Sequence, residues 1–205
     1  MAAEHSFDRT YWERHWSRGG PAGRPPRPHP YLAAETAHLE PGRALDAGCG
    51  VGAEAVWLAE HGWAVTGADI SASALTAALA HGRRNGVEDR LEWVETDLLT
   101  WEPARTWDLV VTSYTHPAKS QEDFYRRLAT WVAPGGTLLV VTHREGGPAA
   151  HEHPPAATST RYGIGELFTA PLWRVRSARE HIRTVATGAG ERQLADVIVR
   201  AHRTA

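Results

Sequence analysis

The chain has 205 residues, a formal net charge of −2 and a single cysteine. This length suits one α/β domain, and a single cysteine excludes an internal disulfide. There is no long basic run and no apolar stretch near the ~18 residues of a membrane span, so we expect neither nucleic acid nor a membrane as a partner. The N-terminus lacks signal-peptide regions, so we expect a cytoplasmic protein. The whole chain contains a single lysine, which resembles coding from a GC-rich bacterial genome. Either a monomer or a homodimer fits this composition.

An aromatic segment precedes the main domain, and we expect residues 1–30 to stand apart as a lid candidate. Aromatic residues recur at helical spacing over 7–16, among them Tyr11, Trp12 and Trp16, which predicts a helix with one aromatic face. The Gly/Pro-rich stretch that follows predicts an extended linker. The aromatic face either closes over a cationic ligand or packs against the domain, and the sequence leaves both roles open.

From residue 31 onward, strand-like and helical segments alternate, which is typical of a parallel sheet with crossover helices. We expect strands near 43–47, 63–68, 91–95, 107–113 and 136–142, and helices over 31–39, 53–61, 71–84 and 119–132. Two more strand-like runs, 172–185 and 193–202, flank a Gly-Ala-Gly turn and predict an antiparallel hairpin. Residues 31–205 should therefore form a single domain.

The most informative motif is a glycine-rich turn between the first strand and the next helix. Gly48, Gly50 and Gly52 leave no Cβ atoms in the way of a ligand, and the helix start offers free N–H groups. Asp46 stands just before the turn, where a carboxylate suits a cationic group better than a pyrophosphate. Cys49 is more simply a small residue in a tight space than a nucleophile. The turn predicts a cradle for a nucleotide-sized ligand.

Two further acids end the next strands. Asp69 follows Asp46 at about the spacing of ~20 residues expected for an acid that binds ribose hydroxyls. Asp97 ends the third strand, and Glu95 is an alternative to it. Aspartate at such positions also caps helices, but its occurrence together with the glycine turn favours ligand binding for Asp46 and Asp69.

In this order the motifs resemble the class I S-adenosylmethionine-dependent methyltransferases. The glycine turn is similar to their first motif, Asp69 to the ribose-binding acid, and Asp97 with Leu98 to the adenine-side acid. Residues 107–111 are similar to their fourth strand, and the Pro-Gly-Gly turn at 134–136 to the entry of their fifth. The opening 7–16 and the segment 29–32 resemble the small, single-domain bacterial methyltransferases of the tellurite-resistance and thiol type.

This resemblance implies an α/β fold, Rossmann-like and doubly wound, with a mostly parallel seven-stranded sheet and a C-terminal antiparallel hairpin. It also implies S-adenosylmethionine as the cofactor. The cofactor-binding residues implied are Asp46, Gly48, Cys49, Gly50, Gly52, Asp69, Ile70, Asp97, Leu98 and Ser113.

The end of the fourth strand supplies candidates for the methyl acceptor, because ligands bind outside the carboxyl ends of such strands. His116 is the first candidate to contact or deprotonate the acceptor, and His143 is the second. Each could instead fix a loop or pack at the rim. We expect Tyr11, Trp12, Trp16, Tyr114 and His116 to bind the acceptor. The segment lacks the Asn/Asp-Pro-Pro-aromatic signature of amino-methylating nucleic-acid enzymes, which favours a small molecule.

The sequence also suggests three alternatives to a methyltransferase site without metal. The pair His151 and His153 lies in a Pro-rich loop without a suggested third ligand, so we expect no metal. Gly48-x-Gly50-x-x-Ala53 formally fits an NAD-dependent oxidoreductase, but no hydride-transfer pair is present. A non-catalytic module that binds the cofactor is the third alternative. We favour a methyltransferase acting on a small sulfur or nitrogen nucleophile.

Overall fold

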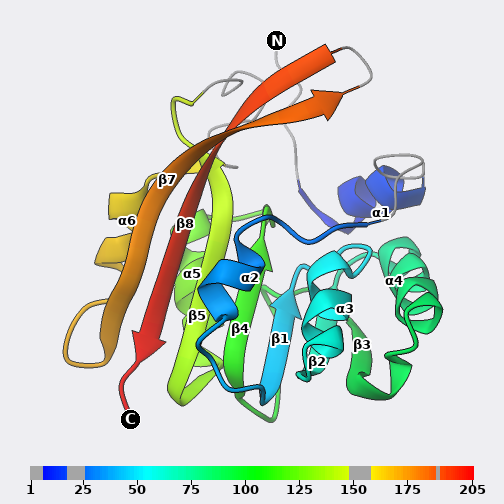
Figure 1. Cartoon of the computed structure of the whole chain (residues 1–205), viewed down its shortest axis with the longest axis horizontal. Coiled ribbons are helices and arrows are strands. Elements are labelled where there is room, and N and C mark those ends of the chain that lie inside the picture. The colour runs from blue at the N-terminus through cyan, green and yellow to red at the C-terminus, as the bar shows by residue number, and fades with distance from the viewer. Residues whose placement is uncertain (1–6, 18–25, 148–157, 188–189) are drawn as a thin grey trace.

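The computed structural model describes residues 7–17, 26–147, 158–187 and 190–205. One twisted sheet lies at its centre, with helices on both faces (Figure 1). The strands are β1 (Arg43–Ala47), β2 (Ala64–Asp69), β3 (Leu91–Glu95), β4 (Trp107–Ser113), β5 (Val132–Arg144), β6 (Thr158–Ser159), β7 (Trp173–Thr187) and β8 (Gly190–Arg203).

Along the sheet the strands run in the order β3-β2-β1-β4-β5-β8-β7, and the short β6 pairs with the end of β5. Strands β1 to β5 are parallel, whereas β8 is antiparallel to both β5 and β7. The expected mostly parallel, seven-stranded sheet with a C-terminal antiparallel hairpin is therefore confirmed. The two-residue β6 adds an eighth strand, which is too short to carry a sequence pattern.

Helices follow the strands largely where the sequence predicts them. They are α1 (Arg9–Ser17), α2 (Leu32–Thr36), α3 (Ala53–Glu60), α4 (Ala72–Arg84), α5 (Gln121–Thr130) and α6 (Arg161–Glu166), with the 3-10 turn η1 (Glu88–Arg90). Ser71 caps α4 as expected, since its hydroxyl accepts a hydrogen bond from the Ala74 N–H at 3.2 Å. No helix in the described part of the chain is both long and apolar enough to cross a membrane.

Several boundaries differ by a few residues from the sequence-based expectation, and the largest difference is at the start of β5. The helix predicted over 119–132 stops before its last two residues, and the strand predicted from residue 136 starts earlier. The reason is that Val132 already pairs with Trp107 of β4, across an irregularity in the register. Sheet pairing at this position overrides helical periodicity.

Alternating side chains of the central strands supply an apolar layer on each face of the sheet. Val110 and Leu138 pack with α5 and α6, whereas Leu109 and Leu139 pack with α2 and α3. All four are 0% exposed. Each such buried side chain contributes about 1.5–3 kcal/mol to folding. The strands therefore fix which helices lie on which face.

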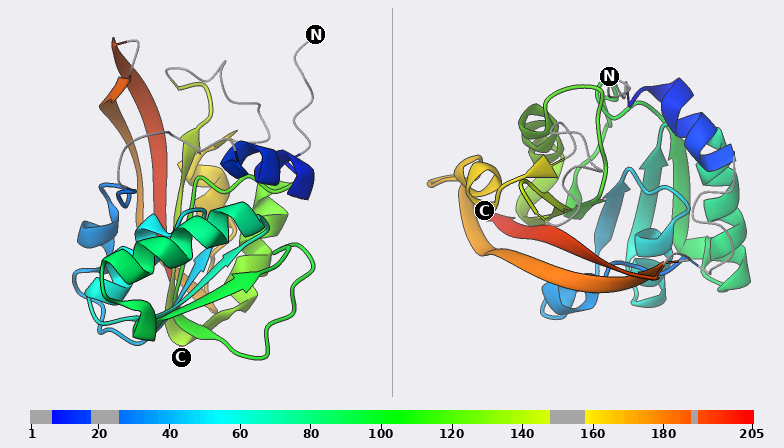
Figure 2. Two further views of the ribbon diagram at one scale, coloured as in Figure 1. Left: turned by 90° about the vertical axis from the view of Figure 1, so that its right-hand side faces the viewer. Right: turned by 90° about the horizontal axis from the view of Figure 1, so that it is seen from above.

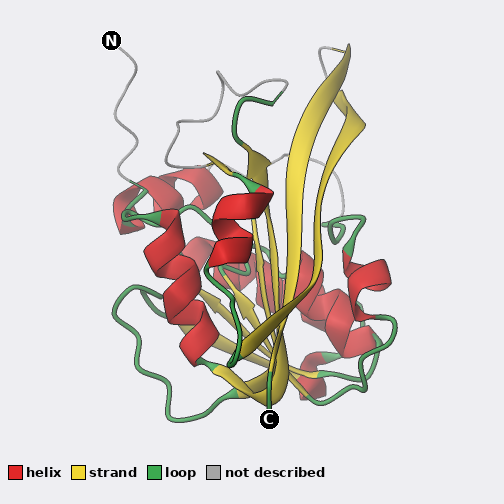
Figure 3. Cartoon of the chain, turned by 90° about the vertical axis from the view of Figure 1, so that its left-hand side faces the viewer, coloured by secondary structure: helices red, strands yellow, loops and turns green. Residues whose placement is uncertain are grey.

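The C-terminal hairpin of β7 and β8 is longer than the parallel strands beside it. Its turn end rises past the carboxyl ends of β1 and β4 (Figures 1 and 3). At the same end of the sheet, α1 lies across the top beside α4 (Figure 2). Both elements thus border the edge where an α/β sheet binds its ligand. The division into an N-terminal segment 1–30 and a domain 31–205 stays a prediction.

Candidate active site

A pocket of about 850 Å³ opens at the carboxyl ends of β1, β2 and β4. Its floor is the glycine turn, and its walls come from the loops after β2, β3 and β4, from α1, and from β5 and β7. Strands β1 and β4 are neighbours at the point where the strand order reverses, which is the usual ligand position in open α/β sheets.

The glycine turn needs its glycines for two physical reasons. Gly48, Gly50 and Gly52 have φ angles of 79°, 51° and 76°, which lie in the left-handed region. A Cβ atom on Gly50 would also lie 2.8 Å from Cζ2 of Trp16 in α1. The end of β1, directly before the turn, is held to the loop after β4, because the Thr115 hydroxyl donates to the Ala47 carbonyl at 3.1 Å.

Asp69 faces the pocket and clamps the turn at the same time. Its Oδ2 accepts the Gly50 N–H at 2.8 Å, and its Oδ1 accepts the Ser71 N–H at 2.9 Å. Burial raises the pKa of the Asp69 carboxyl, although these backbone donors oppose the shift. A carboxylate in this position can accept hydrogen bonds from ligand hydroxyls while its backbone partners fix its orientation.

Asp46 lies beneath the turn rather than in the pocket wall. It is 1% exposed, and its Oδ2 accepts the Ala55 N–H at the start of α3 at 3.1 Å. Burial raises the pKa of Asp46 well above its ordinary value, and the nearby charge of Glu54 adds to this shift. Gly52, another predicted cofactor contact, likewise forms the N-cap of α3 without lining the pocket.

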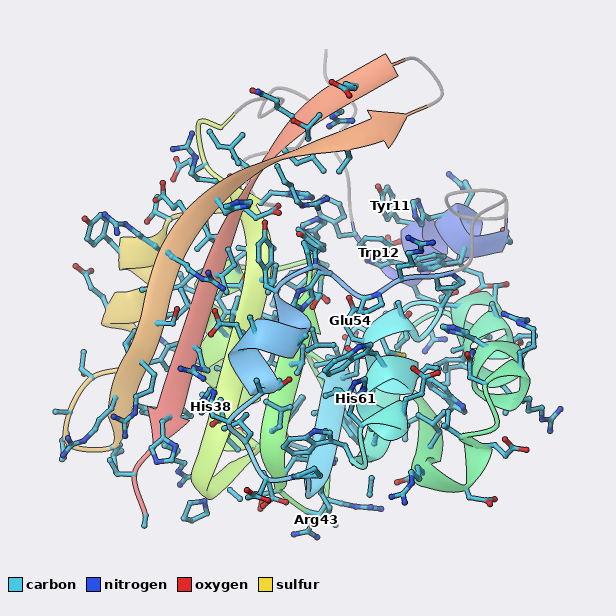
Figure 4. All side chains as sticks on the ribbon, viewed as in Figure 1. Tyr11, Trp12, His38, Arg43, Glu54 and His61 are labelled. Atoms are coloured by element: carbon cyan, nitrogen blue, oxygen red, sulfur yellow. The ribbon has the colours of Figure 1, made fainter. Side chains whose placement is uncertain are left out.

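Glu54 is a pocket residue that the sequence reasoning missed. It sits in the first turn of α3, lines the pocket and accepts the His29 N–H at 3.0 Å. Figure 4 shows it beneath Tyr11 and Trp12. In the sequence, only its position directly after the glycine turn could have indicated a role in binding. An acid in the first turn of a helix is usually explained by its favourable interaction with the helix dipole. Burial raises the pKa of Glu54, so a cationic ligand beside Asp46 and Glu54 would relieve the cost of their charges.

The remaining predicted cofactor residues line the pocket: Cys49, Ile70, Asp97, Leu98 and Ser113. Asp97 Oδ1 accepts the Leu99 N–H at 2.9 Å, whereas the alternative Glu95 forms an ion pair with Arg9 at 2.5 Å and is not part of the wall. Burial raises the pKa of the Cys49 thiol well above its ordinary value, so it stays protonated. This agrees with a packing role.

His116 lies in the wall, 9% exposed, between Phe7 of the N-terminal segment and Gln121 of α5. Gln121 Nε2 lies 3.2 Å from both the Thr115 carbonyl oxygen and His116 Nδ1. Because this amide nitrogen donates to the carbonyl, His116 Nδ1 is an acceptor and its proton is on Nε2. In this tautomer Nε2 of His116 is a hydrogen-bond donor.

Tyr114 and His143 lie beside His116 in the wall, with ring centroids 4.8 Å apart from each other. Tyr114 has a φ of 54°, an uncommon backbone for a bulky residue and one that tends to occur at functional sites. Its hydroxyl accepts a hydrogen bond from Arg183 at 3.1 Å, and burial raises the pKa of Tyr114. Arg183 comes from β7, so the hairpin contributes to the pocket.

The predicted aromatic helix covers the pocket. Tyr11, Trp12 and Trp16 all line it, and the Trp12 ring stacks with the His116 ring at 6.3 Å. Glu13, on the same helix, accepts a hydrogen bond from the Ser71 hydroxyl at 2.7 Å. The structure thus brings the expected acceptor residues together with the glycine turn in one space.

No metal site is evident among the residues that the structure describes, which contain no group of three or more His, Cys, Asp or Glu side chains suited to hold an ion. The pair His151 and His153 lies outside the described residues.

Fold and site define a Rossmann-like protein built to hold a nucleoside-type cofactor with a cationic centre. Residues 44–136 match a family model described as a methyltransferase domain. Ribosomal RNA small subunit methyltransferase C of Alcanivorax borkumensis is 42% identical over 112 residues, which are 52% of this chain and 34% of that protein. Probable thiol methyltransferase 2 of Arabidopsis thaliana is 31% identical over 147 residues, which are 67% of this chain and 65% of that protein. The chain thus spans less than two thirds of either relative.

A solved structure described as the conversion of a disulfide bond into a thioacetal group during echinomycin biosynthesis has a TM-score of 0.71 and 26% identity, over 95% of this chain and 92% of that one. These comparisons support the expected class I S-adenosylmethionine-dependent methyltransferase, with the methyltransferase domain at residues 44–136. The expected family and its cofactor are confirmed, and the NAD-dependent alternative is set aside. The residues present fit this cofactor, since the glycine cradle and the buried acids suit a nucleoside with a cationic centre.

Proposed function

We propose that the protein transfers the methyl group of S-adenosylmethionine to a small-molecule acceptor with a sulfur or nitrogen nucleophile. One observation carries this proposal: the glycine turn and the aromatic and histidine side chains expected for the acceptor line a single pocket. A donor and an acceptor held in the same space can be aligned for direct transfer. Alignment alone can supply about 7–11 kcal/mol of the barrier reduction.

Each part of the cofactor has a matching part of the pocket. We assign Asp69 to the ribose hydroxyls, Asp97 with Leu98 to the adenine side, and the turn with Glu54 to the cationic amino-acid end. The bound cofactor supplies a methyl group already activated by its sulfonium. The chain has to orient the acceptor, exclude water and, where the acceptor carries a proton, remove it.

The acceptor side of the pocket is largely aromatic. Trp12 and Tyr114 offer flat faces, and aromatic faces attract cations and exclude water. The His116 N–H can donate a hydrogen bond that orients the acceptor. The position of α1 across the pocket favours a small molecule over a nucleic acid.

Two of the similar proteins support a sulfur acceptor. One is named a thiol methyltransferase, and the 26% identical structure is described by the conversion of a disulfide into a thioacetal. The relative named for ribosomal RNA is matched over 34% of its length. A sulfur nucleophile needs less activation by a base than a hydroxyl does. This agrees with a site in which His116 is a hydrogen-bond donor.

Parallel calorimetric titrations with S-adenosylhomocysteine, S-adenosylmethionine and NAD test the cofactor assignment. We expect micromolar affinity for the first two and none for NAD. A mass-spectrometric screen of thiols and heteroaromatic amines then tests methyl transfer. Binding of the cofactor without a methylated product in this screen would favour the non-catalytic binding module instead.

A further inference from the structure

Three residues on neighbouring antiparallel strands, His143, Asp196 and His181, lie side by side in the sheet. His143 of β5 is the cross-strand partner of Asp196 in β8, and Asp196 is the partner of His181 in β7. Cross-strand partners place their side chains on the same face of a sheet. His143 lines the pocket and Asp196 lies directly behind it, on a strand that the sequence resemblance did not connect with catalysis.

The two oxygens of Asp196 are used differently. Its side chain is 0% exposed, and Oδ2 accepts hydrogen bonds from the Tyr31 hydroxyl at 2.8 Å and from Arg183 Nε at 2.6 Å. Oδ1 has no hydrogen-bond partner in the described part of the chain, and it lies 3.9 Å from Nδ1 of His143. A buried carboxylate oxygen without a donor lowers the stability of the fold. Long hydrogen-bond distances in a catalytic site, such as that from Oδ1 to His143 Nδ1, commonly shorten when the ligands bind.

We propose that Asp196 is a positioning residue that holds the His143 proton on Nδ1, so that Nε2 of His143 acts as the base for the methyl acceptor. This inference rests on the proposed function. It also narrows the acceptor class to nucleophiles that carry a proton at neutral pH, such as an alkyl thiol or a heteroaromatic N–H. A halide needs no such base.

In this step the proton on the acceptor sulfur or nitrogen moves to His143 Nε2, and the freed electron pair forms the bond to the methyl carbon. The carbon–sulfur bond of the sulfonium breaks, its electron pair stays on sulfur, and S-adenosylhomocysteine results. The imidazolium faces the Asp196 carboxylate, which favours its positive charge. Water takes the proton after the product leaves.

The groups around His143 agree with this role. Arg183 carries a positive charge, but it is paired with the Oδ2 side of Asp196. Burial raises the pKa of Tyr114, so its hydroxyl stays neutral at physiological pH. On the other side β6 presents the uncharged Thr158, and the ring of His116 lies 5.8 Å away. The two histidines would therefore have different roles: His116 donates a hydrogen bond that orients the acceptor, and His143 removes the proton of the acceptor.

The direct test is an NMR titration of the histidine ring signals in the complex with S-adenosylhomocysteine, with His143 assigned from the His143→Gln variant. In Asp196→Asn we expect the titration midpoint of His143 to fall by about one to three pH units, as for loss of a neighbouring opposite charge. Tyr31→Phe is the matched control, since it removes the donor to Oδ2 and a contact with His181 Nδ1 at 3.1 Å but no contact of Oδ1, and it should keep the wild-type midpoint of His143. An unchanged midpoint in Asp196→Asn would overturn the proposal.

A kinetic test uses two thiols as probes and works even where Asp196→Asn does not fold. 2-Mercaptoethanol is protonated at neutral pH, whereas 4-nitrothiophenol is already ionised. His143→Gln should lower kcat/KM for 2-mercaptoethanol about 10²–10³-fold and remove its dependence on pH, with little effect on 4-nitrothiophenol. Equal losses for both thiols would contradict a base. Should the wild type methylate neither thiol, the sulfur acceptor of the proposed function is wrong, and the NMR midpoint alone decides the role of Asp196.

Discussion

Glu13 of α1 accepts a hydrogen bond from the Ser71 hydroxyl at 2.7 Å, and so ties the helix above the pocket to the residue that caps α4. The same carboxylate also accepts the Ser73 N–H at 3.3 Å and a short hydrogen bond from the Ser73 hydroxyl. One acidic side chain thus connects α1 to the helix that follows Asp69. We therefore expect the position of α1 over the pocket to depend on Glu13.

Glu13→Ala should speed the release of S-adenosylhomocysteine severalfold, because α1 loses its contact with the start of α4. Stopped-flow measurement of ligand release tests this. Arg14→Ala, an exposed change on the same helix, serves as control and should leave the release rate unaltered. Equal release rates in Glu13→Ala and the wild type would show that other contacts hold α1.

The Glu13 contact should also respond to pH. The Ser73 and Ser71 hydrogen bonds lower the pKa of Glu13 below 4.5. The contact is therefore complete above pH 4.5 and is lost as the pH falls through the lowered value. We expect ligand release from the wild type to accelerate only in this acidic range, and release from Glu13→Ala to lack this acceleration.

Asp69→Asn should weaken S-adenosylhomocysteine binding about 10- to 100-fold, since hydrogen bonds to a charged group are worth about 1.5–3 kcal/mol. The substitution keeps the shape of the side chain but replaces one acceptor of the Gly50 or Ser71 N–H by a donor, so circular dichroism serves to verify that the fold survives. Asp89→Asn, at an exposed position in η1, provides the comparison. Unchanged affinity in calorimetry would refute the ribose assignment.

Gly50→Ala should abolish tight cofactor binding, because the added Cβ strains a left-handed residue and meets Trp16 at 2.8 Å. Gly86→Ala separates these two effects: Gly86 also has a positive φ of 67°, but a Cβ there meets nothing within 4 Å. Both variants should lose about 1 kcal/mol of stability from backbone strain. Only Gly50→Ala should lose binding. Parallel loss in both variants would mean that strain alone is responsible.

Arg183→Met should destabilise the fold by about 2–4 kcal/mol, since it leaves the fully buried Asp196 carboxylate without its charged partner. Urea denaturation measures this change. Arg174→Met, an exposed arginine on the same strand, should shift the midpoint little. Similar effects of the two substitutions would show that the Arg183 pair contributes nothing specific.

The alternation of strands and helices and the cofactor half of the pocket could be predicted from the sequence because local patterns encode them. A glycine turn between a strand and a helix fixes the positions of Gly48 and Gly50, and an acid at the end of the next strand fixes Asp69. These residues lie within about one strand–helix–strand unit of each other. Parallel pairing then brings them together without further information.

The acceptor half could be predicted only in part, because long-range contacts assemble it. His116 and Tyr114 follow from the end of β4, but Arg183 reaches the pocket, and Asp196 the back of His143, only through the register of the hairpin. Glu54 was missed because an acid in a first helical turn has an ordinary explanation. The protonation of His116 depends on Gln121, whose side chain no sequence pattern connects to it.

The sheet order has a consequence for how such a protein can diversify. The glycine turn and the ribose position are built on β1 and β2, which have neighbours on both sides, whereas β7 ends the sheet and pairs with β8 alone among the strands that the structure describes. Exposed arginines on β7, such as Arg174 and Arg176, protect that edge from joining another sheet. Substitutions along an edge strand disturb fewer neighbours than substitutions in a central one. Evolution can therefore alter the chemistry accepted by the hairpin side while the donor side stays the same.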